Sequence, residues 1–314
     1  MSDFVKISKE DDGIRLDKWF KRHRSDIPHG LLQKLLRKGA IKLAGKKAKA
    51  DQKIATGQEI RIPEIEEREP RQPKKIYANK DDAEKHLLGN ILYKDEDIIA
   101  INKLPGLPAQ GGSKVKLSVD DMLPFLKFDY KDKPKLVHRI DKDTSGVMVL
   151  ARSATAATKL SELFRGRNIK KTYWAIVMGV PSKKSGKIKL PLSTKTGTIE
   201  KTLVDEEKGK SAETHYRVID TAGHELALVE LQPITGRTHQ LRAHMVAIGH
   251  PILGDGKYGG KSAFINSLSK KMHLHARNIK FESYDITAPL PRHMSETFKA
   301  FEFDENQPCA LDCS

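Results

Sequence analysis

This chain of 314 residues has only two cysteines, no long apolar run and no export signal at the start of the sequence. Its two cysteines, Cys309 and Cys313, lie within the last six residues, which excludes a disulfide framework and indicates a reducing compartment. No stretch reaches the roughly 18 consecutive apolar residues of a membrane helix. The first residues, MSDFVKISKEDDG, contain no apolar signal region. We therefore expect a cytoplasmic protein with no membrane attachment. We read the cysteines as part of a flexible tail, with a redox or metal role left open.

The motifs of nucleotide-dependent and metal-dependent chemistry are also missing. There is no glycine-rich phosphate-binding loop. His239 and His244 are five positions apart and do not share a helical face, which argues against a zinc pair. DKDTSG, residues 141–146, is faintly similar to the phosphorylated motif of ion-pumping ATPases, but those enzymes need membrane helices and further acidic motifs. A phosphotransfer enzyme is therefore disfavoured.

Positive charge is what the chain has in excess, with a formal net charge of +16. Residues 14–63 contain 14 Lys or Arg and four acidic residues, so much of the excess is concentrated near the N-terminus. Each Lys or Arg set against a phosphate releases a counterion, and a basic segment therefore favours a nucleic acid partner. A generic basic protein of the cytosol is the alternative.

The basic segment is predicted to form two helices followed by short strands. RLDKWFKRH, residues 15–23, and LLQKLLRKG, residues 31–39, carry apolar side chains at helical spacing, and Gly39 is a typical helix stop. AIKLAGKKAK predicts a hairpin with its turn at Ala44–Gly45, and KIATGQEIRIP predicts a second hairpin turning near Gly57. This order resembles the small RNA-binding fold named after ribosomal protein S four, here called the S-four fold.

That resemblance implies that basic side chains of this segment lie along an RNA backbone. The alternative is a basic helix face that is merely solvated. The RNA-contacting candidates are Arg15, Lys18, Lys34, Arg37, Lys38, Lys42, Lys46 and Lys47.

Composition divides the chain into two domains, a linker and a tail. Residues 1–65 are expected to form the S-four-like domain, and residues 66–86, of mixed charge with little apolar periodicity, a linker. Residues 87–305 are expected to form the larger domain, and residues 306–314 a flexible tail. In the larger domain strand hairpins outnumber strand–helix–strand units. This favours an α+β fold with a mixed, largely antiparallel sheet and flanking helices, not a Rossmann fold.

The most unusual segment of the larger domain is LVHRIDKDTSGVMVL, residues 136–150. Four full charges and a histidine lie there between two apolar runs, at a strand end where catalytic residues often sit. Residues 143–146 are good turn formers, so turn chemistry alone can explain them. Asp141 is different, because Arg139 and Lys142 beside it favour an ionised carboxylate, which suits a nucleophile or a base.

A second polar segment is GRTHQLRAH, residues 236–244. Its arginines and histidines are available to bind phosphate or to pair with a buried carboxylate. Arg237 and Arg242 are five positions apart, so we expect them to point in different directions and to do different jobs. Either the segment is a basic helix end that touches RNA, or one arginine holds Asp141.

HRIDKDTSG, KKTYWAIV and GRTHQLRAH, in this order, resemble the three motifs of the RluA-type pseudouridine synthases. NKLPGLPAQGGS, GHPILGDGKYG and LHARNIKFE also fit that pattern, and the match covers residues 90–303. With the S-four-like domain ahead of it, the chain is most similar to the branch that modifies 23S ribosomal RNA. The family isomerises uridine to pseudouridine without redox change or an added group. The resemblance therefore implies no cofactor and no metal.

The resemblance also implies roles for residues of these motifs. Asp141 is the implied catalytic residue, acting on the ribose as nucleophile or base, and Arg242 its ion-pair partner. Tyr173 is implied to stack on the target base and Leu241 to form an apolar wall. Arg139 is implied to take the place of the flipped uridine. The other substrate-binding candidates are His138, Thr144, Arg237 and His239.

The sequence thus predicts a monomeric enzyme whose partner is RNA, with 23S ribosomal RNA as its substrate. The alternative is a non-catalytic RNA-binding or ribosome-assembly factor on the same fold. Such a factor would have the same distribution of charge but would tolerate the loss of Asp141.

Overall fold

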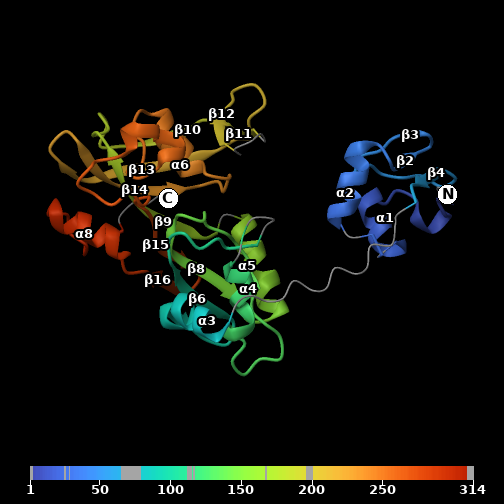
Figure 1. Cartoon of the computed structure of the whole chain (residues 1–314), viewed down its shortest axis with the longest axis horizontal. Coiled ribbons are helices and arrows are strands. Elements are labelled where there is room, and N and C mark those ends of the chain that lie inside the picture. Colours follow the sequence, from blue (N-terminus) through green and yellow to red (C-terminus); the bar gives the residue numbers. More distant parts are fainter. Residues whose placement is uncertain are drawn as a thin grey trace. The chain divides into compact units, whose positions relative to one another are not determined.

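The chain consists of two compact units, Met1–Lys74 and Lys75–Ser314, and each is described by itself (Figure 1). Residues 66–78 of the expected linker, and Cys313 with the end of the tail, lie outside the described residues. Within the described part no helix is long and apolar enough to cross a bilayer. The computed structural model describes residues 3–24, 26–27, 29–64, 79–111, 115, 117–166, 168–195 and 201–309.

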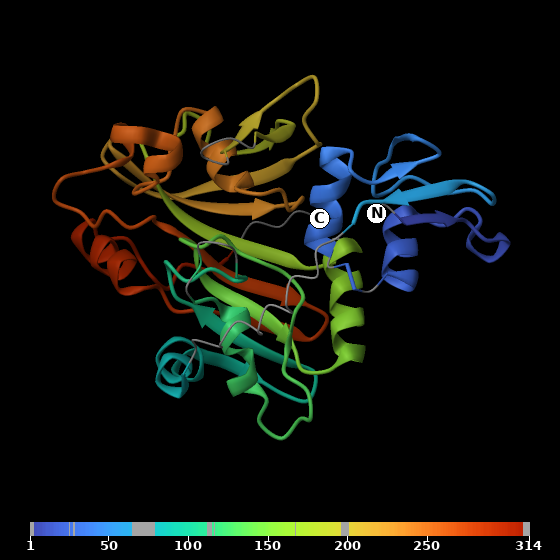
Figure 2. The same cartoon turned by 45° about the vertical axis from the view of Figure 1, so that its right-hand side comes forward.

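The N-terminal unit, blue in Figures 1 and 2, combines two helices with a small antiparallel sheet. Apolar side chains of both helices and of the sheet form its core, among them Trp19, Phe20, Leu36 and Ile60. A short 3-10 helix, η1, covers Lys9–Asp11. The helices are α1 (Leu16–His23) and α2 (His29–Lys38), and the strands, in sheet order, are β1 (Asp3–Lys6), β4 (Glu59–Ile62), β2 (Lys42–Leu43) and β3 (Lys46–Lys47).

One predicted hairpin of this unit is confirmed and the other is wrong. Ala44 and Gly45 both have positive φ, at 48° and 76°, as a tight hairpin turn between β2 and β3 requires. The chain does turn at residues 55–58, but β4 after that turn pairs with β1 and β2 instead of with the residues just before it. The pairing of β4 with β1 was missed because its partners are more than fifty residues apart in sequence.

The larger unit is built on one long, twisted sheet (Figure 2). Within the described residues ten strands belong to it, in the order β10-β13-β14-β9-β15-β8-β6-β5, with β16 added to β15 and β7 to β8. The pair β8 and β15 is parallel and the other pairs are antiparallel. The predicted α+β class with a mixed, largely antiparallel sheet is confirmed.

The elements of this unit have the following bounds. The sheet strands are β5 (Ile91–Lys94), β6 (Ile98–Lys103), β7 (Lys135–Leu136), β8 (Ser145–Ala151), β9 (Lys170–Met178), β10 (Ser185–Lys189), β13 (Glu213–Ala222), β14 (Leu226–Pro233), β15 (Leu274–Phe281) and β16 (Tyr284–Thr287). A separate hairpin consists of β11 (Leu192–Lys195) and β12 (Lys201–Val204). The helices are α3 (Lys80–His86), α4 (Val119–Met122), α5 (Ala154–Gly166), α6 (Gln240–Ala247), α7 (Gly256–Gly259) and α8 (Arg292–Ala300), with 3-10 turns η2 (Leu88–Asn90), η3 (Leu123–Leu126) and η4 (Gly260–Ala263).

Helices cover both faces of the sheet. Successive residues of a strand point to opposite faces, so both faces carry apolar side chains that these helices bury. On β9, Trp174 packs with Met294 and Phe298 of α8, whereas Ala175 packs with Met245 of α6. Tyr173 lies on the same side as Ala175 and Trp174 on the other. The two aromatic rings of this strand therefore lie on opposite faces of the sheet.

Two boundaries differ from the sequence prediction. Residues 80–86 of the expected linker form helix α3, which begins at a capping box between Asn79 and Asp82. The expected turn over residues 143–146 is shorter, since Ser145 and Gly146 already belong to β8. Gly146 has φ of +109°, and a Cβ there would overlap the backbone of Ala276 on β15. Glycine therefore lets β8 and β15 come together directly after the loop that carries Asp141.

Candidate active site

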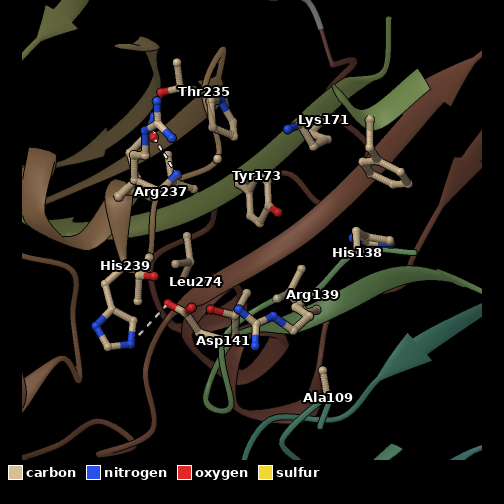
Figure 3. A pocket seen from close by; sticks show the side chains of 18 of the residues that line it. Ala109, His138, Arg139, Asp141, Lys171, Tyr173, Thr235, Arg237, His239 and Leu274 are labelled. Carbon is tan, nitrogen blue, oxygen red and sulfur yellow. Dashed lines mark hydrogen bonds and ion pairs between the residues drawn. The ribbon is translucent and has the colours of Figure 1, made fainter. Parts of the chain in front are cut away.

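A cavity of about 730 Å³ opens in the larger unit where β9, β15, the start of α6 and the loop before β8 meet. In Figure 3 the Tyr173 ring of β9 points toward the side of the cavity where Asp141 and Arg139 lie. Eight of the nine residues predicted for catalysis or substrate binding line this cavity; Arg242 lies just beyond it. Those eight residues are His138, Arg139, Asp141, Thr144, Tyr173, Arg237, His239 and Leu241.

Backbone contacts on both sides of Asp141 hold its loop in place. The Thr144 N–H donates to the Asp141 carbonyl at 3.2 Å, and the Gly106 N–H donates to the Lys142 carbonyl at 2.9 Å. The Lys103 ammonium group, fully buried, donates to the carbonyls of Lys142, Leu104 and Leu107 at 2.8 to 3.0 Å. Burial lowers the pKa of Lys103 to about 7, although the nearby carboxylates of Asp143 and Asp141 oppose that change. The loop that carries Asp141 is thus fastened to the loop that follows β6.

Arg242, on α6, is the cation closest to Asp141, with Nη1 3.7 Å from Oδ2. Its stronger partner is Asp255, because Nε and Nη2 each donate to a carboxylate oxygen of Asp255 at 2.7 Å. Both side chains of this pair are almost fully buried. Burial opposes the charge of Arg242, but the hydrogen bonds and charge of Asp255, together with Asp141, raise its pKa above the ordinary value. The sequence prediction that Arg242 pairs with Asp141 is therefore incomplete, since it omits the residue that orients the guanidinium.

His239 approaches the same oxygen of Asp141, with Nε2 3.9 Å from Oδ2 (Figure 3). Its backbone is left-handed, with φ of 50°, directly before α6. The Thr202 N–H donates to the Tyr258 hydroxyl at 3.0 Å, and that hydroxyl lies 2.9 Å from His239 Nδ1. Because burial lowers the pKa of His239, the imidazole is mainly neutral near pH 7. The Tyr258 hydroxyl then donates to Nδ1, and the imidazole proton is on Nε2, facing Asp141.

Tyr173 and Leu274 form the apolar side of the cavity, together with Leu241. Burial, and secondarily the charge of Asp141, raise the pKa of Tyr173 above its ordinary value, so the phenol stays protonated. Lys171, two residues earlier on β9, lines the same cavity, and burial lowers its pKa. A flat apolar ring opposite a carboxylate suits a pyrimidine nucleoside, whose base stacks while its ribose meets the acid.

His138 has a mainly structural place. Its Nε2 accepts the Val149 N–H at 2.9 Å, and its ring stacks on Phe164 of α5 at 4.4 Å between centroids. Burial lowers the pKa of His138 to about 3, so the ring is neutral. Because Nε2 is engaged with the β8 backbone, this nitrogen is not available to substrate. His138 was predicted to bind substrate. The structure leaves only its ring available for this, as part of the cavity wall.

The remaining predicted residues differ in exposure. Arg139 is exposed at the mouth of the cavity, whereas Thr144 is buried at its base. Arg237 is exposed and its Nε donates to the Ser211 carbonyl at 3.1 Å. Arg237 and Arg242 thus point in different directions, as their spacing predicted.

In the N-terminal unit the RNA-contacting candidates lie on α1 or directly before it, on α2 and on the β2–β3 hairpin. Lys18, Lys34, Arg37 and Lys38 are exposed, as are both lysines of β3; Lys42 is half-buried. Arg15 is paired with Asp17, whose carboxylate lies 2.7 Å from its guanidinium. Arg15 is therefore a weaker candidate than the others.

The chain resembles known proteins in sequence and in fold. A family model described as RNA pseudouridylate synthase matches residues 97–247. A Rickettsia conorii protein named ribosomal large subunit pseudouridine synthase C is 40% identical over 84% of this chain and 88% of its own length. A Vibrio cholerae protein of the same name is 31% identical over 93% of this chain and 95% of its own. The chain belongs to the RNA pseudouridine synthase family. Human RNA pseudouridylate synthase domain containing 4 shares the fold, with a TM-score of 0.59 and 33% identity over 69% of this chain and 94% of that one.

As a pseudouridine synthase, the enzyme must break a glycosidic bond, turn the uracil over and form a carbon–carbon bond within one closed site. The cavity offers a carboxylate held between a cation and a neutral imidazole, opposite an apolar wall. Within the described residues no group of three or more His, Cys, Asp or Glu side chains is placed to hold a metal ion.

Four residues that shape this synthase site were not singled out from the sequence: Lys103, Lys171, Asp255 and Tyr258. Lys171 could have been found, because it alternates with Tyr173 on a predicted strand. Asp255 and Tyr258 lie in GHPILGDGKYG, which was used only as part of the family pattern. Their partners are on α6 and on the β11–β12 hairpin, and local spacing cannot reveal those contacts.

Proposed function

We propose that this pseudouridine synthase modifies uridines of large-subunit ribosomal RNA, with Asp141 as its catalytic residue. The curated relatives from Rickettsia and Vibrio are named for the large ribosomal subunit, which supports this substrate class. The observation that carries the catalytic assignment is the position of the Asp141 carboxylate, 3.7 Å from Arg242 and in a cavity whose apolar wall contains Tyr173 and Leu274. We further propose that the enzyme is cytoplasmic and monomeric.

In this proposal the target uridine leaves its stack and its base enters the cavity against Tyr173. Asp141 acts on the ribose while the bond between N1 and C1′ breaks. The freed uracil rotates, C5 bonds to C1′, the C5 proton leaves to solvent and N1 gains a proton. Asp141 reacts through its carboxylate whether it attacks the ribose or removes a proton, and the Arg242 guanidinium faces that group. Arg139, at the mouth, stacks in the space that the flipped base has left.

The N-terminal unit is proposed to be an S-four-like domain that holds the RNA. Helix α2 ends with two exposed basic residues, Arg37 and Lys38. The β2–β3 hairpin follows directly in the chain and carries further exposed lysines. Such groups contribute affinity through counterion release and are not expected to read bases.

The proposal is tested by release of tritium from ribosomal RNA labelled at C5 of uridine, because each pseudouridine formed loses that atom. Asp141→Asn should lower the rate by about a thousandfold or more, since removal of a reacting group typically costs this much, while RNA binding is kept. An Asp141→Asn enzyme with the wild-type rate would contradict the catalytic role. A non-catalytic assembly factor would release no tritium even as the wild-type protein.

A further inference from the structure

A second cavity, of about 580 Å³, lies beside the first in the larger unit. The two cavities share Lys142 and His239. Lys142 follows Asp141 in the chain, and the His239 side chain contacts the Asp141 carboxylate. The second cavity therefore begins beside Asp141, which itself lines the first cavity. Its walls are the loop around Gly106, the segment around Asp255 and the segment 270–272.

Positive charge dominates this second cavity. Its lining contains five cationic residues and two carboxylates. One carboxylate, Asp255, is buried and its charge is balanced by two hydrogen bonds from Arg242, which leaves four lysines against Asp143. His239 adds no charge near pH 7, because burial lowers its pKa. The five cationic residues are Lys142, Arg242, Lys257, Lys270 and Lys271. A concave surface of one charge focuses its field and attracts ligands of the opposite sign.

The walls that carry these lysines are fixed by backbone contacts. The Lys142 carbonyl is held from one side by Gly106 and by Lys103. On the other side Gly254 has φ of +82°, and a Cβ there would overlap the Lys271 carbonyl. The His273 N–H donates to the Leu253 carbonyl at 2.8 Å, so the chain after Lys271 lies directly against the chain before Asp255. The Lys270 and Lys271 side chains are exposed and extend from this fixed backbone.

We propose that the second cavity binds phosphate groups of the RNA strand next to the uridine whose base enters the first cavity. This inference rests on the proposed function. Uracil is neutral and needs an apolar wall, whereas the phosphodiester chain is anionic and is excluded from that wall. With the ribose at Asp141, one direction of the chain leads along the adjoining surface, and the lining of the second cavity offers cations there. Each phosphate contact of this kind adds affinity and salt dependence without reading sequence.

The test uses the full-length enzyme, tritium-labelled ribosomal RNA and the double variant Lys270→Ala/Lys271→Ala. We expect about a tenfold loss in kcat/KM, carried mainly by KM, and a salt slope of log(kcat/KM) that is shallower by about one to two. The matched control is Lys183→Ala/Lys184→Ala, two adjacent exposed lysines of the same unit that line neither cavity. The variant Lys270→Arg/Lys271→Arg should keep the wild-type KM, because phosphate binding here requires the positive charge and not the lysine shape.

Three outcomes separate the possibilities. Equal KM and salt slope in the Ala variant and its control, with an active wild type, would overturn this inference and leave the proposed function intact. Failure of the wild type to release tritium would instead remove the proposed function. Inorganic pyrophosphate, added as an inhibitor, tests whether the cavity instead binds a free small anion. Inhibition of the wild type that the Ala variant escapes, with unchanged KM for RNA, would assign the cavity to that anion and overturn the RNA assignment.

Discussion

Arg242 donates two hydrogen bonds of 2.7 Å to Asp255. Only the remaining guanidinium nitrogen, Nη1, approaches Asp141, at 3.7 Å. The buried Asp255 carboxylate thus fixes the plane of the guanidinium and leaves one nitrogen for Asp141. Because both members of the pair are buried, neither can lose the other without leaving an uncompensated charge in the protein interior.

Replacing Asp255 by Asn tests this arrangement. The amide keeps one acceptor but loses the charge, so the Arg242 guanidinium is no longer held in place. We expect kcat to fall by about 10- to 100-fold and the unfolding free energy to fall by about 3 kcal/mol. Tritium release and urea unfolding measure the two effects. Wild-type kcat in Asp255→Asn would show that Asp141 does not depend on this anchor.

Tyr258 should act on catalysis through His239. Tyr258→Phe removes the donor to Nδ1, which lets the imidazole carry its proton on that nitrogen and withdraws the N–H from Asp141. We expect about a tenfold loss in kcat, comparable to one lost hydrogen bond to a charged or reacting group. A double-mutant cycle with His239→Ala separates the routes. The double variant should be no slower than His239→Ala alone, and additive losses would mean that Tyr258 acts by another path.

The buried Lys103 should make stability depend on pH in alkaline solution. Its pKa is about 7 in the folded protein and 10.5 ordinarily, so between these values the unfolded chain binds more protons. The free energy of unfolding therefore rises with pH in this window, by at most about 1.4 kcal/mol per pH unit, and the contribution is constant below it. Lys103→Met removes this dependence.

The measurement compares urea unfolding of the wild-type and Lys103→Met proteins from pH 6 to about pH 10. Both carry Trp19→Phe, so that Trp174, the other of the two tryptophans, reports the larger unit alone. The difference between the two unfolding free energies should grow in favour of wild type above pH 7. Parallel curves would mean that Lys103 is not strongly perturbed.

The basic end of α2 should contribute affinity for RNA without changing chemistry. Arg37→Ala/Lys38→Ala is expected to weaken binding of ribosomal RNA about tenfold and to reduce the salt slope of log Kd by about two. Lys9→Ala/Lys21→Ala, two exposed lysines of the same unit outside the candidate set, is the control. If both variants lose the same affinity, the contribution is diffuse charge and not a contact surface.

Local pattern was enough for most helices and strands. The helix stop at Gly39 and the hairpin turn at Ala44–Gly45 follow from hydrophobic period and glycine, because short-range sterics determine them. The motifs likewise brought together Asp141, Tyr173 and Arg242, although they lie far apart in the chain. That step depended on resemblance to a family, since no spacing in the sequence reports a distance across the sheet.

What only the tertiary structure decided was which partner each polar group found. The sequence indicates that Asp141 stands among cations, but Arg139 and Lys142 beside it are exposed, and the close cation is Arg242 from α6. His138 contacts the β8 backbone, and Asp255 holds Arg242, through contacts that no local period encodes. Backbone conformation and apolar alternation are local properties of a chain. The desolvation and pairing of a buried charge depend on everything packed around it, and those neighbours meet only in the folded protein.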